Sequence, residues 1–187
     1  MADELKPEVK PPAAKAPPTM ACVPWESDLT RALQEHFTDR VVEFSTYLGQ
    51  EFLIAKPEAV VPILEFLKLE ADFDYLVDVT AVDRLDRSER FELVYILYSF
   101  SRNQRIRIKT SVAEGFQPAT ATGVHPTANW LEREVFDMFG IEFAGHPNMC
   151  RILMPDEWQG YPLRKDYPIL QQDQAWVREN LGIDSAQ

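Results

Sequence analysis

The sequence predicts an α+β domain: a mixed, mainly antiparallel sheet of about five strands with helices packed on one face. Helical and strand-like hydrophobic periodicities follow one another along residues 25–143. The later strand candidates are joined by short connections, which favour antiparallel neighbours. Prolines at 118, 126, 147, 155, 162 and 168 then interrupt the chain, so an extended segment rich in proline and aromatic residues is expected to follow the domain.

The first half of the domain is expected to contain two helices and two strands. The predicted elements are a helix over about 28–38 capped by Ser27-Asp28, strands at Val41–Thr46 and Glu51–Ala55, and a helix over about 58–69. Pro62 would break a helix interior. We therefore place it in the first turn, where backbone N–H groups have no intrahelical partner.

Three further strands are expected at Tyr75–Val82, Phe91–Phe100 and Arg105–Val112. The middle one is apolar on both faces, as a central strand should be. The last one alternates, so that its basic residues Arg105, Arg107 and Lys109 share one face. This row predicts either a charged edge strand that resists aggregation or a basic strip for an acidic partner.

The N-terminus has a composition that differs from the rest of the chain. Residues 1–24 hold six of the 14 prolines, together with alanine and lysine, and are predicted to form a disordered arm. The predicted organisation is this arm over 1–24, an α+β domain over 25–143 and an extended, partner-wrapping segment over 144–187.

Charge and composition exclude several classes of function. A net charge of −11 argues against nucleic acid or an anionic membrane surface as a direct partner. Two cysteines exclude a disulfide scaffold and any four-cysteine site built from this chain alone. The longest apolar run, Phe91–Phe100, is far shorter than the roughly 20 residues of a membrane-spanning helix. The N-terminus lacks the apolar region of a signal peptide, so membrane association is expected only through a partner.

A third helix is expected over Asn129–Phe139, with Asn129 as its cap and Gly140 just after its end. At 100° per residue, most side chains of this predicted helix fall into two arcs. One arc is apolar, and the other contains Trp130, Arg133, Glu134 and Asp137.

Glu132 is the anomaly of this helix, because it projects among apolar side chains where an unpaired carboxylate is costly to bury. One expectation is an ion pair with an arginine of the same chain, Arg151 or Arg164. The alternative is a cation or backbone donors on a partner subunit. A catalytic role is the weakest alternative, because no histidine or second acid is placed with it.

No catalytic, cofactor-binding or metal site is expected in this chain. His146 and Cys150 lie four positions apart, but Pro147 intervenes and no further clustered ligands follow. The acids between 72 and 86 lack the glycine and spacing of a calcium loop. A phosphate-cradling glycine loop and a Gly-x-Ser-x-Gly elbow are also missing from the sequence. The isolated chain is therefore expected to be inactive.

Several ordered motifs together resemble one family. They are Glu132–Ile141 (EREVFDMFGI), Gly145-His146-Pro147, Arg151-Ile152-Leu153 and Gly160–Pro168 (GYPLRKDYP), with Leu76–Asp83 (LVDVTAVD) similar to the family's core strand. The family is the 30-kDa subunit of respiratory complex I, the proton-pumping NADH:quinone oxidoreductase. The resemblance covers about 27–168, and the chain resembles the unfused bacterial form.

The resemblance implies a non-catalytic subunit of the peripheral arm, on the cytoplasmic side of the bacterial inner membrane. Electrons would pass from NADH to quinone through FMN and iron–sulfur clusters held by partner subunits, with no cofactor in this chain. The implied partners are the 49-kDa-type subunit, the small cluster-bearing subunit and other peripheral-arm subunits. The alternatives are an equivalent scaffold in a membrane-bound hydrogenase or deazaflavin dehydrogenase complex, or an independent soluble oxidoreductase.

The residues expected at the partner interface come from the third helix and from the proline-rich segment after it. Trp, Tyr and Arg dominate interface hot spots, and a proline-stiffened segment loses less entropy when it docks. The alternative is that this segment wraps its own domain. The predicted interface residues are Glu132, Arg133, Glu134, Asp137, His146, Arg151, Trp158, Tyr161, Arg164, Lys165, Asp166 and Tyr167.

Overall fold

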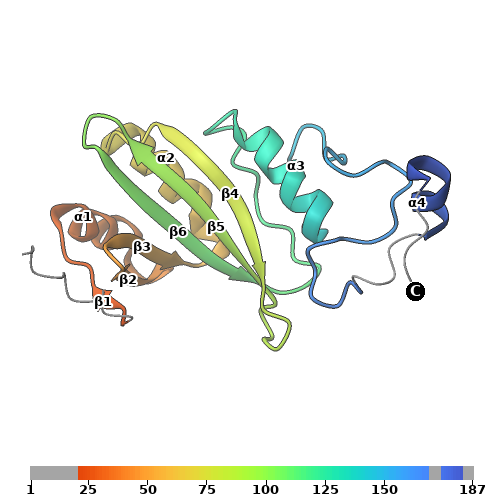
Figure 1. The fold of residues 1–187 in the computed structure, drawn as a ribbon. Coiled ribbons are helices and arrows are strands. Elements are labelled where there is room, and N and C mark those ends of the chain that lie inside the picture. Colours follow the sequence, from red (N-terminus) through yellow and green to blue (C-terminus); the bar gives the residue numbers. More distant parts are fainter. Residues whose placement is uncertain (1–20, 169–173, 183–187) are drawn as a thin grey trace, which may run out of the picture.

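A six-stranded sheet forms the centre of the molecule, with the strand order β1-β2-β3-β6-β5-β4 (Figure 1). The computed structural model describes residues 21–168 and 174–182. The strands are β1 (Val23–Pro24), β2 (Val41–Tyr47), β3 (Gln50–Ala55), β4 (Tyr75–Asp83), β5 (Phe91–Ser99) and β6 (Gln104–Val112). The predicted strands are thus confirmed to within one or two residues at each end, and β1 is an addition.

All neighbouring strands pair antiparallel except β3 and β6, which run parallel. Short turns join β2 to β3, β4 to β5 and β5 to β6, so each of these pairs is a hairpin. The β4–β5–β6 meander ends with β6 against β3, and this brings the two halves of the sheet together. The predicted class, a mixed but mainly antiparallel α+β fold, is confirmed.

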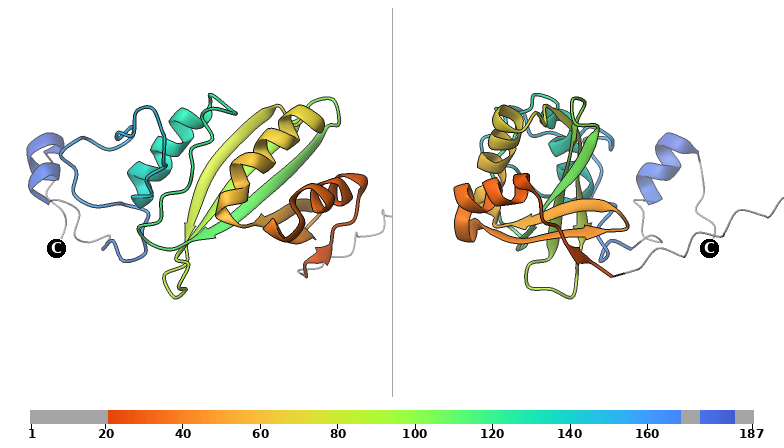
Figure 2. Two further views of the ribbon diagram at one scale, coloured as in Figure 1. Left: turned by 180° about the vertical axis from the view of Figure 1, so that it is seen from behind. Right: turned by 90° about the vertical axis from the view of Figure 1, so that its left-hand side faces the viewer.

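Helices α1 (Asp28–Phe37) and α2 (Val60–Glu70) lie on the same side of the sheet (Figure 2). The side chain of Ser27 accepts from the N–H of Thr30, and the Thr30 hydroxyl accepts from the Ser27 N–H, which makes a capping box for α1. A 3-10 turn, η1 (Thr38–Arg40), follows α1, and another, η2 (Pro57–Ala59), precedes α2. Pro62 lies in the first turn of α2, as predicted.

The hydrophobic core lies between α2 and the helix-covered face of the sheet. Ile63, Leu64 and Leu67 of α2 have no exposed surface, and neither do the sheet residues Leu53, Leu93, Ile106 and Ile108. The register aligns Leu53, Ile108, Tyr95 and Val79 in one row across four strands. Because side chains alternate along each strand, the neighbouring rows face the opposite, helix-free side.

Helix α3 (Ala128–Phe139) packs beside β4 at the edge of the sheet (Figure 1). Its ending is as predicted, since Gly140 has a φ of 74° and its N–H bonds to the Phe136 carbonyl. Its beginning is not: the cap position is Thr127, without a side-chain cap bond, and Asn129 lies inside the helix. The Asn129 cap prediction was therefore wrong by two positions.

Three other expectations need correction. The arm predicted over 1–24 ends too late, because Val23 and Pro24 pair with Thr46 and Ser45 of β2; residues 1–20 lie outside the described part. The segment 144–187 is not extended throughout, because it includes helix α4 (Gln174–Leu181). Finally, β6 lies between β3 and β5, so its basic row does not mark an edge strand. Residues 169–173 and 183–187 also lie outside the described part.

Across residues 21–168 and 174–182, the chain contains no helix with the length and apolar character required to span a bilayer.

Candidate functional site

The polar arc of α3 is occupied by the chain itself. Residues 150–168, which we name the tail segment, run along α3 and return to the sheet. The guanidinium of Arg133 donates to the carbonyl oxygens of Cys150, at 3.1 Å, and Arg151, at 2.9 Å. Part of the polar arc, which was predicted to contact a partner subunit, therefore contacts the tail segment of the same chain.

Asp137 anchors the next residues of the tail segment. Its carboxylate has no exposed surface. It accepts the consecutive backbone N–H groups of Ile152, Leu153 and Met154 at 3.0, 2.7 and 2.8 Å, and the guanidinium of Arg151 at 2.6 Å. Burial by itself raises the pKa of Asp137, but these donors outweigh it and leave the pKa below its usual value.

Arg151 folds the tail segment back on itself, and Arg164 ties the segment to the end of α3. Arg151 donates to the carbonyls of Trp158, at 3.0 Å, and Gly160, at 3.1 Å. Arg164 donates to the carbonyl of Phe139 at 2.5 Å, at the end of α3, and its guanidinium lies 4.7 Å from the centre of the Tyr161 ring. Carbonyls at a helix end have no intrahelical partner, so this arginine caps α3.

The tail segment is joined to the sheet through a buried arginine. Arg90 makes a two-pronged bond to Asp83, at 3.0 and 2.9 Å, and further bonds to Glu114, at 3.0 Å, and Asp166, at 2.7 Å. The N–H of Lys165 also donates to Asp83, at 2.8 Å. We name Asp83, Arg90, Glu114 and Asp166 the Arg90 network. Hydrogen bonding to Arg90 lowers the pKa of Asp83, although burial opposes it.

The sequence did not single out Asp83, Arg90 or Glu114 as site residues. The signal for Asp83 was present, since it ends the LVDVTAVD strand at a position whose side chain faces the core. The spacing of residues in the sequence does not show that Arg90, at the end of the charged loop, is the partner of Asp83. The two side chains meet only because β4 pairs with β5 in this register.

Glu132 lies in a second buried cluster, on the other side of α3. Its carboxylate accepts the hydroxyl of Thr120 at 2.5 Å and the N–H of Ala121 at 2.7 Å. The predicted partner arginine was wrong, because Arg151 and Arg164 are engaged elsewhere. The backbone donor expected from a partner subunit comes instead from this chain. Burial raises the pKa of Glu132 to about 7, because the two donors offset only part of the desolvation cost.

His146 joins the Glu132 cluster. Its Nε2 lies 3.1 Å from the carbonyl oxygen of Asn129 and 4.0 Å from the Glu132 carboxylate. The N–H of Asn148 points to Nδ1 at 3.1 Å, so Nδ1 accepts and Nε2 carries the proton that is donated to Asn129. The cluster holds the GHP motif against α3.

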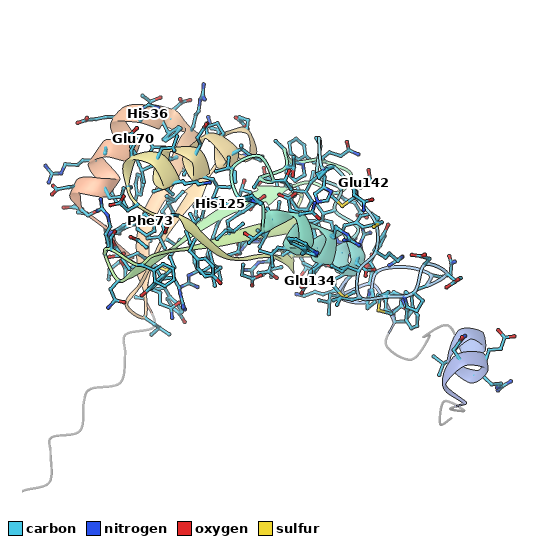
Figure 3. All side chains as sticks on the ribbon, turned by 90° about the horizontal axis from the view of Figure 1, so that it is seen from above. His36, Glu70, Phe73, His125, Glu134 and Glu142 are labelled. Atoms are coloured by element: carbon cyan, nitrogen blue, oxygen red, sulfur yellow. The ribbon has the colours of Figure 1, made fainter. Side chains whose placement is uncertain are left out.

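The remaining predicted interface residues differ in exposure. Glu134 is exposed on α3, away from the α1–α2 side marked by His36 and Glu70 (Figure 3). Lys165 is exposed as well, Tyr161 and Tyr167 are half-buried, and Trp158 is buried. The large apolar side chains left open on α3 and the tail segment include Trp130, Leu153 and Leu163, which are 59%, 60% and 55% exposed.

In the described residues, no group of three or more His, Cys, Asp or Glu side chains is arranged to hold a metal ion. The polar groups brought together around α3 are hydrogen-bonded to one another and to the backbone. These hydrogen bonds hold α3 and the tail segment together as one rigid surface.

Comparisons with known proteins agree on one family. The family model described as "Respiratory-chain NADH dehydrogenase, 30 Kd subunit" matches residues 53–173. The C subunit of the NADH-quinone oxidoreductase of Geotalea uraniireducens (strain Rf4) is 46% identical over 138 residues, which cover 73% of this chain and 84% of that protein. The corresponding protein of Trichlorobacter lovleyi is 48% identical over 148 residues, covering 76% of this chain and 91% of that protein.

A solved structure shows the same fold. One chain of the membrane-bound sulfane sulfur reductase, an archaeal respiratory membrane complex, matches with a TM-score of 0.68 and 24% sequence identity. The match covers 86% of this chain and 94% of that chain.

Proposed function

Because the chain belongs to the 30-kDa subunit family of respiratory-chain NADH dehydrogenase, we propose that it is a non-catalytic, peripheral-arm subunit of a proton-pumping NADH:quinone oxidoreductase. In that role it supports the 49-kDa-type subunit and the small cluster-bearing subunit that together form the quinone site. FMN and the iron–sulfur clusters belong to partner subunits, and the isolated chain has no activity. The chain lies on the cytoplasmic side of the inner membrane and is held there by the complex.

One observation carries the proposal: the family match over 53–173 contains all of α3, the Arg90 network and the tail segment up to Pro168. The family match therefore includes every element that builds the surface of α3 and the tail segment, together with α2 and strands β4, β5 and β6. The internal hydrogen bonds of Asp137, Arg151 and Arg164 hold this surface in shape before any partner binds. Preorganised surfaces lose less entropy on association.

The surface formed by α3 and the tail segment has the composition of a protein–protein interface. Trp130 projects from α3, and Ile152 and Leu153 project from the part of the tail segment that Asp137 holds. Glu134 and Lys165 supply exposed charges on the same two elements. Exposed apolar side chains rimmed by charges are typical of protein–protein contacts.

The test is a mild-detergent purification of the affinity-tagged chain from its native membranes, followed by an assay of NADH:quinone reduction. We expect a large active assembly whose flavin and iron–sulfur absorbance comes from other subunits. Recovery of the chain alone, or a stoichiometric flavin, cluster or zinc bound to the chain itself, would contradict the proposal.

An equivalent scaffold role in a related membrane complex is the second candidate, because the same fold occurs in the archaeal sulfane sulfur reductase complex. The same purification separates the two. Copurifying flavin- and NADH-binding subunits support the NADH:quinone oxidoreductase, and an active assembly without them supports a related complex.

A further inference from the structure

Two arginines near one end of β6, on the helix-free face of the sheet, lack a partner among the described residues. Arg105 and Arg107 are on β6, which pairs with β3 on one side and β5 on the other. Lys109 on the same face is accounted for, since it lies 3.8 Å from Glu92 and 4.4 Å from the centre of the Phe52 ring. Within the described residues, neither Arg105 nor Arg107 has a hydrogen-bond, ion-pair or ring partner for its side chain.

No helix of the described chain covers these arginines. Figure 1 shows β4, β5 and β6 without a helix in front of them, while α2 lies behind the sheet, where Ile106 and Ile108 are buried. An antiparallel sheet can leave one face in water, so exposure alone calls for no explanation. The protection of an edge, which would explain a basic row, does not apply to an interior strand.

Exposed aromatic rings lie beside the arginines. Tyr98 of β5 is the cross-strand partner of Arg105. Its ring lies 4.9 Å from that of Phe100, and the Phe100 ring lies 5.7 Å from that of Tyr75. Phe100 is 69% exposed and Tyr75 is 47% exposed. Arginine next to exposed aromatic rings is the composition found at the centre of protein interfaces.

The surface is hollowed at this corner of the sheet. Arg105, Arg107 and Tyr98 line an open cavity of about 350 Å³. Other polar groups around it are already paired: the Tyr98 hydroxyl donates to Asn103 at 2.5 Å, and Gln104 donates to Glu51 at 2.5 Å. Among the described residues, the two guanidinium groups are therefore the charged donors that the cavity leaves free.

We propose that this surface docks an acidic, extended segment of a neighbouring subunit, with an Asp or Glu carboxylate between Arg105 and Arg107 and an apolar side chain against Tyr98 and Phe100. The two arginines lie two positions apart on one strand, about 7 Å apart along the sheet. Their planar forks match a carboxylate. The inference rests on the proposed function, because it requires a neighbouring subunit.

Charge complementarity selects the occupant. The chain carries a net charge of −11, so most of its surface repels an acidic segment. The cavity contains one carboxylate, that of Glu51, which bonds to Gln104, and the two guanidinium groups outweigh it, so the cavity attracts such a segment. The surface thus specifies where the segment binds as well as strengthening its binding. The helix-free face is separate from the α3 surface, so the chain offers two docking surfaces.

A zero-length cross-link tests the docking directly. In an Arg105→Lys variant incorporated into the complete assembly, a carbodiimide should couple the new amine to an Asp or Glu of another subunit, and mass spectrometry would identify that residue. If residue 105 couples to no other subunit while the assembly is recovered intact, the docking is wrong and the proposed function stands. If no assembly is recovered with the unaltered chain, the proposed function fails.

Charge reversal supplies the matched energetic test. Arg105→Glu/Arg107→Glu is compared with Arg40→Glu/Arg87→Glu, which makes the same charge change at exposed arginines elsewhere. Each lost charge-assisted bond should weaken retention in the assembly about tenfold, and the thermal midpoint of the isolated chain should change equally little in both variants. Equal retention of the two double variants would overturn the proposal.

A third experiment tests whether a protein segment or a lipid occupies the surface at Arg105 and Arg107. Phenylglyoxal modification of Arg105 and Arg107 should fall at least about tenfold in the detergent-purified assembly relative to the isolated chain. Vesicles of phosphatidylglycerol should not protect them in the isolated chain. Protection by vesicles without protection in the assembly would assign the surface to anionic lipid and overturn the proposal.

Discussion

The guanidinium of Arg90 lies 2.7 Å from the carboxylate of Asp166, although 76 positions separate the two residues. The same guanidinium holds Asp83 at the end of β4, and Asp83 accepts the N–H of Lys165. One buried cation thus sets where the tail segment meets the sheet. The position of the surface proposed to bind partners is therefore a consequence of the domain's own packing.

Replacing Arg90 should destabilise the whole domain. Arg90→Ala leaves the Asp83 carboxylate buried without its cation, and removal of one partner of a buried pair costs about 3 kcal/mol. Urea unfolding of the isolated chain measures the loss. Arg87→Ala, in the exposed loop three positions earlier, is the control and should stay within about 0.5 kcal/mol of the unaltered chain. Equal stability of the two variants would show that the Arg90 network contributes nothing.

Gly140 is required for two reasons that a matched pair of variants can separate. Gly140 and Gly49 both have a φ of 74°. A Cβ on Gly140 would lie 2.5 Å from the Tyr161 ring and 2.7 Å from the Arg164 guanidinium, whereas nothing lies within 4 Å of one on Gly49. Gly49→Ala should cost about 1 kcal/mol, from backbone strain alone.

Gly140→Ala should cost at least about 1 kcal/mol more than Gly49→Ala, because Tyr161 and Arg164 must move as well. Urea unfolding compares the two variants, and hydrogen exchange should rise only in Gly140→Ala at the N–H of Leu163, which bonds to the Met138 carbonyl. A similar cost for both, with unchanged exchange, would mean that the tail segment adapts without strain.

Glu132 should make stability depend on pH. Because its pKa is raised to about 7 in the folded chain, the folded state binds more protons than the unfolded state between the ordinary value of 4.5 and about 7. The free energy of unfolding therefore falls as pH rises through this window, by up to about 3 kcal/mol. The contribution is fully present below 4.5 and is lost above about 7.

Glu132→Gln should remove this slope, since an amide keeps a neutral side chain with an acceptor for the Ala121 N–H. Denaturant unfolding at a series of pH values from about 5 to about 8 is the measurement, with Glu134→Gln, an exposed acid on the same helix, as the control. Parallel pH profiles of the Glu132→Gln variant and the unaltered chain would rule out the proposed titration.

Leu153 should be needed for assembly and dispensable for folding. It is 60% exposed on the part of the tail segment held by Asp137. Leu153→Asp should reduce recovery of the chain with the purified assembly several-fold and change the free energy of unfolding by no more than about 0.5 kcal/mol. Leu69→Asp, at a leucine that is 67% exposed on α2, is the matched control and should be recovered normally. Reduced recovery of both variants would remove the assignment of the interface to the tail segment.

Much of the fold was accessible from local patterns. The alternation of β6, the apolar run of β5 and the glycine after α3 each specify a local conformation through side chains close in sequence. The anomaly of Glu132 was also visible, since its position among apolar residues indicates burial. The groups that donate hydrogen bonds to Glu132 could not be predicted. Thr120 and Ala121 lie in an irregular loop, and no periodicity in the sequence shows the path of that loop.

The family, the class of the fold, the main helices and strands, and the acidic charge of the chain can all be read from the amino-acid sequence. Which charges remain free follows instead from tertiary contacts. The structure pairs Arg151 with Asp137, Arg164 with the carbonyl of Phe139, Arg90 with Asp83 and Asp166, and Thr120 with Glu132. Among the described residues it leaves Arg105 and Arg107 unpaired on an interior strand. Local conformation depends on neighbours in sequence, whereas ion pairing depends on strand order and on contacts between residues that are distant in sequence.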